Sequence, residues 1–238
     1  MSEEAIKTGD PSASGPLIEA VDMHKRFGGT LALDGLSIDV AGGEIVAVLG
    51  PSGSGKSSLL LCLSGILLPH AGDVRYRGRS LVTVSDATRT RLRRDEFGFV
   101  FQFGQLVPEL TALDNVSLPL RLAGLKRRDA ITRARDWLER LGVHDVADQR
   151  AGEMSGGQAQ RVAVARALVT GPRVVFADEP TGSLDSTNSE LVMELLVSAA
   201  RQHATSVVLV THEPQIAAYA DREIVLRDGR IAHTAALV

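Results

Sequence analysis

Short apolar runs rich in β-branched residues recur along the chain and alternate with longer segments whose apolar residues return every three or four positions. The first pattern is typical of strands and the second of helices. Strands are predicted at residues 17–26, 31–40, 44–49, 73–77, 97–101, 173–178 and 206–211, with a final hairpin at 223–232 that turns at Asp228-Gly229. Helices are predicted at residues 56–67, 82–94, 115–123, 129–141, 157–170 and 186–203.

The order of these elements predicts an α/β fold. Gly28-Gly29 separates the first two strands, which indicates an antiparallel pair, and the later strands alternate with helices as in a parallel sheet. We predict a disordered tail at 1–16, rich in Ser, Gly and Pro, followed by one domain at 17–235. Residues 102–161 are mainly helical, so they form a helical subdomain inserted into a core made of residues 17–101 and 162–235.

Composition narrows the class of protein. The 238 residues are 44% hydrophobic and only 4% aromatic, as expected where helices bury parallel strands on both faces. A net charge of −3 gives the whole chain no attraction to polyanions, so nucleic acid is not expected as a partner. No apolar run has the length of a membrane-spanning helix, and no apolar signal segment opens the sequence. The chain is therefore expected to be neither secreted nor embedded in a membrane.

Three features have simple structural interpretations. Cys62, the only cysteine, lies in an apolar stretch and is expected in the core. Trp137 is expected as a packing anchor in the helical subdomain. The densest positive cluster comprises Arg89, Arg91, Arg93 and Arg94. We interpret it as a solvated helix face, with binding to anionic lipid or to a partner as the alternative.

A glycine-rich loop supplies the strongest chemical signal. Residues 50–57 read G-P-S-G-S-G-K-S between a predicted strand and a predicted helix, the context that distinguishes a phosphate loop from a surface turn. In such a loop the amides of Gly53 to Ser57 hold phosphates, Lys56 adds positive charge, and the Ser57 hydroxyl reaches Mg²⁺. The predicted substrate is therefore a nucleoside triphosphate bound with Mg²⁺.

Two carboxylates end a predicted buried strand. Asp178 and Glu179 follow the apolar run Val174-Val175-Phe176, and buried strands seldom end in two acids for packing reasons alone. Phosphoryl transfer to water needs positively charged groups beside the phosphates and a hydrogen-bond acceptor that orients the attacking water. We predict that Asp178 steadies Mg²⁺ through a water molecule and that Glu179 is the catalytic base.

A third motif separates this chain from other phosphate-loop proteins. Met154-Ser-Gly-Gly-Gln158 opens the helix predicted at 157–170, and here the chain resembles the ATP-binding subunits of ABC transporters, whose signature is usually L-S-G-G-Q. Met154 replaces the leucine, a volume-conserving change. The resemblance covers residues 17–232 and implies an ATPase that converts ATP and water to ADP and phosphate. It implies a P-loop NTPase (RecA-like) core with an N-terminal antiparallel β-subdomain and an inserted helical subdomain, the ABC ATPase fold.

The resemblance also implies roles for further residues. Phe27 would stack on adenine, Gln102 would contact Mg²⁺ and sense the membrane partner, and His212 would contact the γ-phosphate. The D-loop would comprise Ser183, Leu184 and Asp185, and the signature residues that contact ATP on a second copy would be Ser155, Gly156, Gly157 and Gln158. The expected catalytic residues are Glu179, His212 and Gln102, and the expected Mg²⁺ site comprises Ser57, Gln102 and Asp178. The expected ATP-binding residues are Phe27, Gly50, Pro51, Ser52, Gly53, Ser54, Gly55, Lys56, Ser57 and Ser58.

Partners follow from the same resemblance. Since each copy carries two half-sites, the working unit would be a head-to-tail dimer that sandwiches two ATP molecules. Residues 101–120 and 158–161 are similar to the MacB, lipoprotein-release (LolD) and FtsE-like group. This similarity implies a peripheral subunit at the cytoplasmic face of the cell membrane that drives an integral permease.

The cargo and the docking segment are expectations of the same kind. In this group the cargo would be a lipid, lipoprotein, peptide, drug or haem that is exported or extracted. An FtsE-like regulator of cell-wall hydrolysis, acting without transport, is the alternative. Residues 102–119 combine Gln102 with the apolar side chains of Phe103, Leu106, Val107, Pro108 and Leu110, so we expect the permease to dock there.

Overall fold

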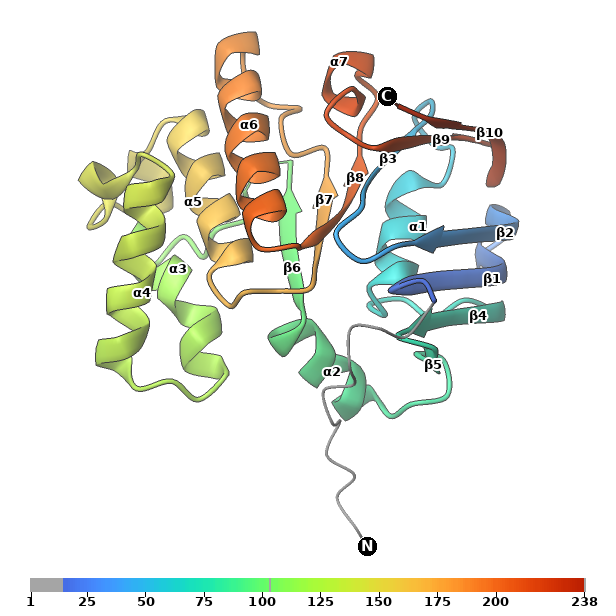
Figure 1. The fold of residues 1–238 in the computed structure, drawn as a ribbon, viewed down its shortest axis with the longest axis horizontal. Coiled ribbons are helices and arrows are strands. Elements are labelled where there is room, and N and C mark those ends of the chain that lie inside the picture. The colour runs from blue at the N-terminus through green and yellow to red at the C-terminus, as the bar shows by residue number, and fades with distance from the viewer. Residues whose placement is uncertain (1–14, 103, 238) are drawn as a thin grey trace, which may run out of the picture.

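The computed structural model of this protein describes residues 15–102 and 104–237. The predicted tail at 1–16 lies outside this part of the chain except for its last two residues. Two sheets lie beside a block of helices that includes α3 (Ala112–Leu122) and α4 (Arg127–Arg140), on the left of Figure 1. Among the described residues, no helix combines the length and the apolar character that crossing a membrane requires.

The larger sheet has six strands in the order β10-β9-β3-β8-β7-β6. Its parallel strands are β3 (Ile45–Leu49), β6 (Phe97–Phe101), β7 (Val174–Asp178), β8 (Ser206–Val210) and β9 (Arg222–Arg227). The last strand, β10 (Arg230–Ala236), is antiparallel to β9 and forms one edge of the sheet. The carboxyl ends of the parallel strands therefore meet along one side of the sheet, which is where α/β folds bind ligands.

The smaller sheet is antiparallel and has the order β2-β1-β4-β5. Its strands are β1 (Ile18–Phe27), β2 (Thr30–Val40), β4 (Ala71–Tyr76) and β5 (Arg79–Ser80). The predicted antiparallel pair at the start of the chain is therefore confirmed. Helix α1 (Lys56–Leu63) lies between the two sheets, where its buried leucines pack with residues of both.

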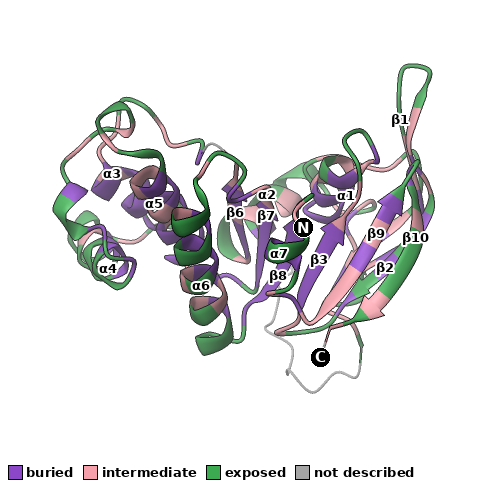
Figure 2. Cartoon of the chain, turned by 90° about the horizontal axis from the view of Figure 1, so that it is seen from above, coloured by how far each residue is buried: buried purple, intermediate pink, exposed green. Residues whose placement is uncertain are grey.

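Helices α5 (Gly156–Leu168) and α6 (Ser186–Gln202) cover the opposite face of the larger sheet and join α3 and α4 in a second core. Strand β7 shows how the two cores share the sheet. Val174 and Phe176 pack in the core around α1, whereas Val175 and Ala177 pack against the helices. Since both faces are buried, the first four residues of the strand are apolar, and the central strands are purple in Figure 2.

Several element ends differ from the sequence prediction. Helix α1 ends at Leu63 rather than at residue 67, because Gly65 adopts φ of +65° and the chain leaves the helical path. Helix α2 (Asp86–Asp95) begins four residues later than predicted, because the Ser85 hydroxyl caps it by accepting from the Thr88 amide. The short helices α7 (Pro214–Ala217), η1 (His144–Val146) and η2 (Ala151–Glu153) were not predicted. Helix α5 runs through residue 161, where the end of the helical subdomain was predicted.

The core predictions for Cys62 and Trp137 are confirmed. Cys62 is buried, and its burial raises the pKa of the thiol to about 11. Trp137 is buried against His203, with 5.6 Å between the ring centres. The interpretation of the α2 arginines as a solvated face is wrong for two of them. Arg89 donates to the carbonyl oxygens of Leu81 and Val84, and Arg93 donates to that of Gly65.

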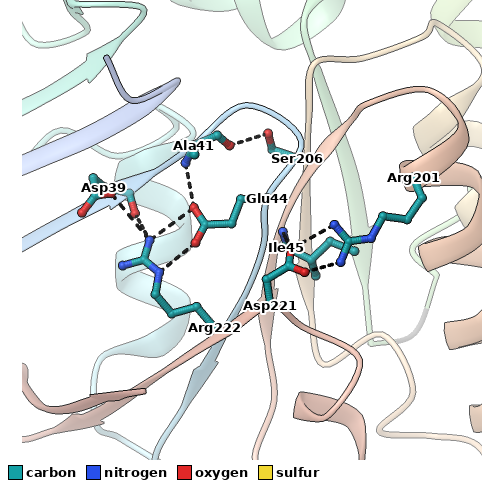
Figure 3. Close-up of polar contacts among 8 residues, drawn as sticks. All are labelled: Asp39, Ala41, Glu44, Ile45, Arg201, Ser206, Asp221 and Arg222. Carbon is teal, nitrogen blue, oxygen red and sulfur yellow. Dashed lines mark hydrogen bonds and ion pairs between the residues drawn. The ribbon is translucent and has the colours of Figure 1, made fainter. Parts of the chain in front are cut away.

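A polar network fixes the amino end of β3, the strand that leads to the glycine-rich loop (Figure 3). Arg222 donates to Glu44 Oε1 over 2.8 Å, and Glu44 Oε2 accepts from the Ala41 amide over 2.7 Å. Asp221 accepts from the Ile45 amide over 2.8 Å and pairs with Arg201 at the end of α6. These contacts tie β3 to β9 and α6, so the loop at the other end of β3 starts from a fixed position.

Candidate functional site

The glycine-rich loop connects β3 to α1 and lies against two neighbouring strands. Gly50 has φ of +149°, and a Cβ there would come within 2.3 Å of the Leu226 carbonyl oxygen. Gly55 has φ of +105°, and a Cβ there would come equally close, at 2.3 Å, to the Ala32 carbonyl oxygen. Both positions therefore require glycine, for backbone conformation and for space. Helix α1 begins directly after the loop, so its first amides point toward the loop.

Lys56 lies folded over this loop. Its side chain is 8% exposed, and Nζ donates to the carbonyl oxygens of Gly50 over 2.7 Å and Pro51 over 3.0 Å. Among the described residues no carboxylate lies within ion-pair distance of Lys56. Its positive charge is therefore available to an anion bound in the loop.

Asp178, the last residue of β7, lies beside the start of α1. Burial raises the pKa of its carboxyl, with Glu179 acting in the same direction, while the nearby Ser57 hydroxyl and Lys56 act in the opposite direction. Asp178 Oδ1 is buried and has no hydrogen-bond partner among the described residues, and the same is true of Ser54 Oγ in the loop. Carboxylate and hydroxyl oxygens are ligands that Mg²⁺ prefers, so Asp178 and the nearby Ser57 fit the ion.

Glu179 and His212 come together from the ends of adjacent strands. Glu179 follows β7 with φ of +48°, and its amide donates to the Val210 carbonyl oxygen of β8 over 2.9 Å. His212 Nδ1 lies 2.9 Å from each of the two carboxylate oxygens, and it donates because an ionised carboxylate only accepts. A non-glycine residue with positive φ is a strained conformation that is common in active sites. The arrangement fixes the direction in which the carboxylate points.

Gln102 lies at the same edge of the sheet. Phe101 is the register partner of Asp178, so Gln102 leaves β6 beside the two carboxylates. Its side-chain amide donates to the Gly182 carbonyl oxygen over 3.3 Å, and the Ser183 hydroxyl donates to its backbone carbonyl over 2.9 Å. The predicted D-loop therefore contacts Gln102 within one chain. Asp185 ends this segment and caps α6 by accepting from the Asn188 amide.

The predicted signature residues form the capped start of α5. Ser155 Oγ accepts from the Gln158 amide over 3.3 Å, and Gln158 Oε1 accepts from the Ser155 amide over 2.9 Å. A Cβ at Gly157 would meet Asn188 Oδ1 at 2.5 Å, whereas at Gly156 the nearest atom is Leu184 Cδ2 at 3.5 Å. Among the described residues, no hydrogen bond joins this segment to the glycine-rich loop. The fold therefore brings together the loop, Asp178, Glu179, His212 and Gln102, but not the signature.

Phe27 ends β1 and is 50% exposed, with Lys25 Nζ 5.5 Å from its ring centre. A phenylalanine placed for core packing would be buried. Its ring is therefore exposed enough to contact a ligand.

Two functional candidates were missed by the sequence analysis. Gln160 Nε2 donates to the Phe101 carbonyl oxygen over 3.0 Å, and Arg166 donates to the carbonyl oxygens of Gly104 and Gln105, each over 2.8 Å. Burial lowers the pKa of Arg166 below its ordinary value. These side chains attach α5 to the segment after Gln102. The signal in the sequence for Arg166 is that it is the one polar residue in the apolar stretch 162–168, whereas Gln160 lies among other polar residues and gives no such signal.

Comparisons with known proteins agree with this geometry. A protein family described as "ABC transporter" matches residues 33–182. The chain is 44% identical over 210 residues to the lipoprotein-releasing system ATP-binding protein LolD 2 of Caulobacter vibrioides, covering 88% of this chain and 92% of that protein. It is 43% identical over 219 residues to LolD of Geobacter metallireducens, covering 90% of this chain and 97% of that protein.

A solved structure is similar over nearly its whole length. It is a dimeric ATP-binding cassette in a post-hydrolysis state with ADP and phosphate bound, and the superposition gives a TM-score of 0.87 at 35% identity over 93% of this chain and 99% of that chain. The fold predicted from the signature motif is therefore confirmed. This chain belongs to the ABC transporter family and is one of its ATP-hydrolysing, ATP-binding cassettes.

Proposed function

We propose that this chain hydrolyses ATP at a site built from its own phosphate loop and the signature motif of a second copy. The observation that carries the proposal is the contact of His212 with both oxygens of Glu179, beside Asp178 and the loop. In this proposal Glu179 orients and deprotonates the attacking water, and His212 holds the carboxylate and then contacts the γ-phosphate. The amides of residues 53–57 and Lys56 bind the phosphates, Phe27 stacks on adenine, and Ser58 and the other loop residues complete the pocket.

Mg²⁺ would be held by Ser57, by Gln102, and by Asp178 through water. When bound it would neutralise charge on the outer phosphates. The unpaired Oδ1 of Asp178 supports this assignment, since a buried carboxylate oxygen without a partner is costly unless a cation or its water completes it.

The second copy enters because the chain's own signature lies apart from its phosphate loop. The start of α5 favours an anion through its dipole and free amides. A head-to-tail pair would bring Ser155 to Gln158 of one copy to the phosphates bound by the other, with both sites equivalent. The similar cassette that was solved as a dimer supports this arrangement.

Complementation between two inactive variants tests the shared site. Lys56→Ala removes the loop cation, and Gly156→Asp places a carboxylate where the partner's phosphate would lie. Neither variant alone builds a working site, but a mixed pair builds one, so activity should peak near equal amounts at ~a quarter of the normal rate. Phosphate release measured across mixing ratios checks this, and activity that stays at background in every mixture would contradict a shared site.

Gly156 is the better position for this substitution. A Cβ added at Gly156 would make only an ordinary van der Waals contact, with Leu184 Cδ2 at 3.5 Å. An acid in the first turn of a helix also favours folding. At Gly157 the new side chain would collide with Asn188 of the same chain, so a loss of activity there would have two explanations.

We further propose that the chain is the peripheral ATPase subunit of a membrane permease at the cytoplasmic face, and that its cargo is a lipoprotein or a similar lipid-modified molecule. The relatives from Caulobacter vibrioides and Geobacter metallireducens, both named as parts of a lipoprotein-releasing system, support this cargo. They favour transport over the FtsE-like regulatory alternative. The division into a core at 17–101 and 162–235 and a helical subdomain at 102–161 is part of the same proposal.

The permease is expected to contact the segment after Gln102. Phe103 lies outside the described residues, and Leu106 packs against the helical core, so it is unsuited to contact a partner. Val107, Pro108 and Leu110 are at least partly exposed and lie outside both cores. Asn115 holds the backbone of Val107 through two hydrogen bonds, which keeps the segment in shape.

Substitutions in this segment test the docking surface. Val107→Asp with Leu110→Asp should leave the ATPase rate of the isolated chain unchanged but abolish its co-purification with an integral membrane protein. Leu106→Asp is the matched control, and it should lower the melting temperature because it buries a charge in the helical core. A double variant that still co-purifies with the membrane protein would place docking elsewhere.

A further inference from the structure

The turn between α3 and α4 carries a cluster of positive charge that the ATPase site does not use. We call residues 121–128 the basic tip. The sequence is Arg-Leu-Ala-Gly-Leu-Lys-Arg-Arg, with no acidic residue before Asp129. In Figure 1 the tip joins the lower ends of α3 and α4, at the bottom of the helical block. A chain with a net charge of −3 therefore has one protruding corner that is strongly positive.

The charges of the basic tip are free. Arg121, Lys126, Arg127 and Arg128 are all exposed, and within the described residues none of their side chains forms a hydrogen bond or an ion pair. Leu122 lies among them and is 62% exposed, more than any other large apolar side chain described. It lies one turn after Leu118 on α3, so the two share a helix face.

The position of the cations is unfavourable for folding. Lys126 is the N-cap of α4 and Arg127 and Arg128 are its first residues, and the cap has no side-chain hydrogen bond. Helix starts favour acids and polar caps, because the macrodipole is positive there. Asp129 supplies one acid in this first turn against three cations, so the balance of charge reduces the stability of α4. A local rule broken without compensating contacts is typical of a functional surface.

The α2 arginines show the contrast. Arg89 and Arg93 donate to backbone carbonyls, and Arg94 pairs with Asp95, so these charges support the fold. The cluster that looks densest in the sequence is thus mostly occupied. The basic tip is the larger set of unoccupied positive charges.

We propose that the basic tip binds the surface of a bilayer containing anionic lipids, with its cations on phosphate headgroups and Leu122 entering the interface. Exposed cations next to an exposed apolar side chain are typical of interfacial contacts. An acidic protein segment would be matched by the cations alone and would not account for the exposed Leu122. Since one weak lipid signal gives only reversible attachment, the tip would add to the permease contact rather than replace it.

This inference goes beyond the ATPase proposal and is tested without a permease. Purified full-length chain is sedimented with vesicles of phosphatidylcholine and with vesicles in which part of that lipid is replaced by phosphatidylglycerol. We expect binding only to the anionic vesicles, and we expect added salt to weaken it, because salt screens exposed charges. Failure of this experiment would leave the shared ATP site untouched.

Variants assign the binding to the tip. Arg127→Gln with Arg128→Gln should weaken vesicle binding by about 25-fold, at about fivefold per cation, without lowering the melting temperature. Leu122→Ser should weaken it further. The matched control is Arg79→Gln with Arg91→Gln, two exposed arginines outside the tip without ion pairs among the described residues, and it should bind nearly as the unchanged chain does.

Three results would overturn the proposal. The first is no binding to anionic vesicles. The second is an equal loss of binding in the control and tip variants, which would show that binding depends on the net charge of the chain and not on the basic tip. The third is that soluble polyglutamate displaces the chain from anionic vesicles as effectively as added anionic vesicles do, and that Leu122→Ser does not change this displacement. That result would indicate an acidic protein partner instead.

Discussion

Replacing Glu179 with glutamine should lower the rate of ATP hydrolysis by about 10² to 10⁴, the usual contribution of a positioned general base. The amide is nearly the same size, and its oxygen can still accept from His212, so the arrangement seen at 2.9 Å should persist. What the variant lacks is the charge that takes the proton from water. ATP affinity should stay close to normal, because Glu179 is not among the residues proposed to hold the phosphates.

The matched control is Glu213→Gln. Glu213 follows His212, and no hydrogen bond or ion pair of its carboxylate is found among the described residues. This variant should hydrolyse ATP at the normal rate. Phosphate release under saturating Mg-ATP measures both variants, and normal turnover by Glu179→Gln would remove it from the role of base.

Replacing Lys56 with alanine should abolish ATP binding at ordinary nucleotide concentrations. Lys56 is the only side-chain cation in the loop, and its burial under the loop carbonyls means that its charge is poorly screened by water. Its removal leaves the loop with backbone amides and hydroxyls but no side-chain cation for the phosphates. Titration calorimetry with a non-hydrolysable ATP analogue should show no heat of binding.

A folded but inactive protein must be distinguished from an unfolded one. Lys56 donates to two loop carbonyls, so its removal costs some stability, and the melting temperature should be measured beside the titration. Lys126→Ala, at an exposed lysine outside the site, should bind the analogue normally. Normal affinity in a folded Lys56→Ala variant would refute the role of the lysine.

The sequence predicts the strands of the larger sheet well because burial on both faces leaves no room for polar residues. Strand β7 is the clearest case, since each of its first four residues is buried in one core or the other. Helix ends were less accurate. The left-handed Gly65 ends α1, and an apolar pattern alone does not reveal that the backbone turns there.

Contacts between segments far apart in the sequence could not be predicted from composition or spacing. The pairing of Glu179 with His212 depends on β7 and β8 being neighbours, which the motifs imply only through family resemblance. The contact of Arg166 with the segment after Gln102 crosses about 60 residues and carries no motif of its own. The free charge of the basic tip was likewise hidden, because exposure and ion pairing decide it.

The central claim is that two copies of the chain enclose ATP between them. The mass of the Glu179→Gln variant in solution, measured by light scattering with and without Mg-ATP, tests this most directly. Since this variant binds ATP but does not consume it, the closed pair should accumulate, and the mass should double when Mg-ATP is added. Adding Lys56→Ala to the same chain should restore the single mass. A Glu179→Gln variant that binds ATP with full affinity and keeps the mass of one chain would contradict the account.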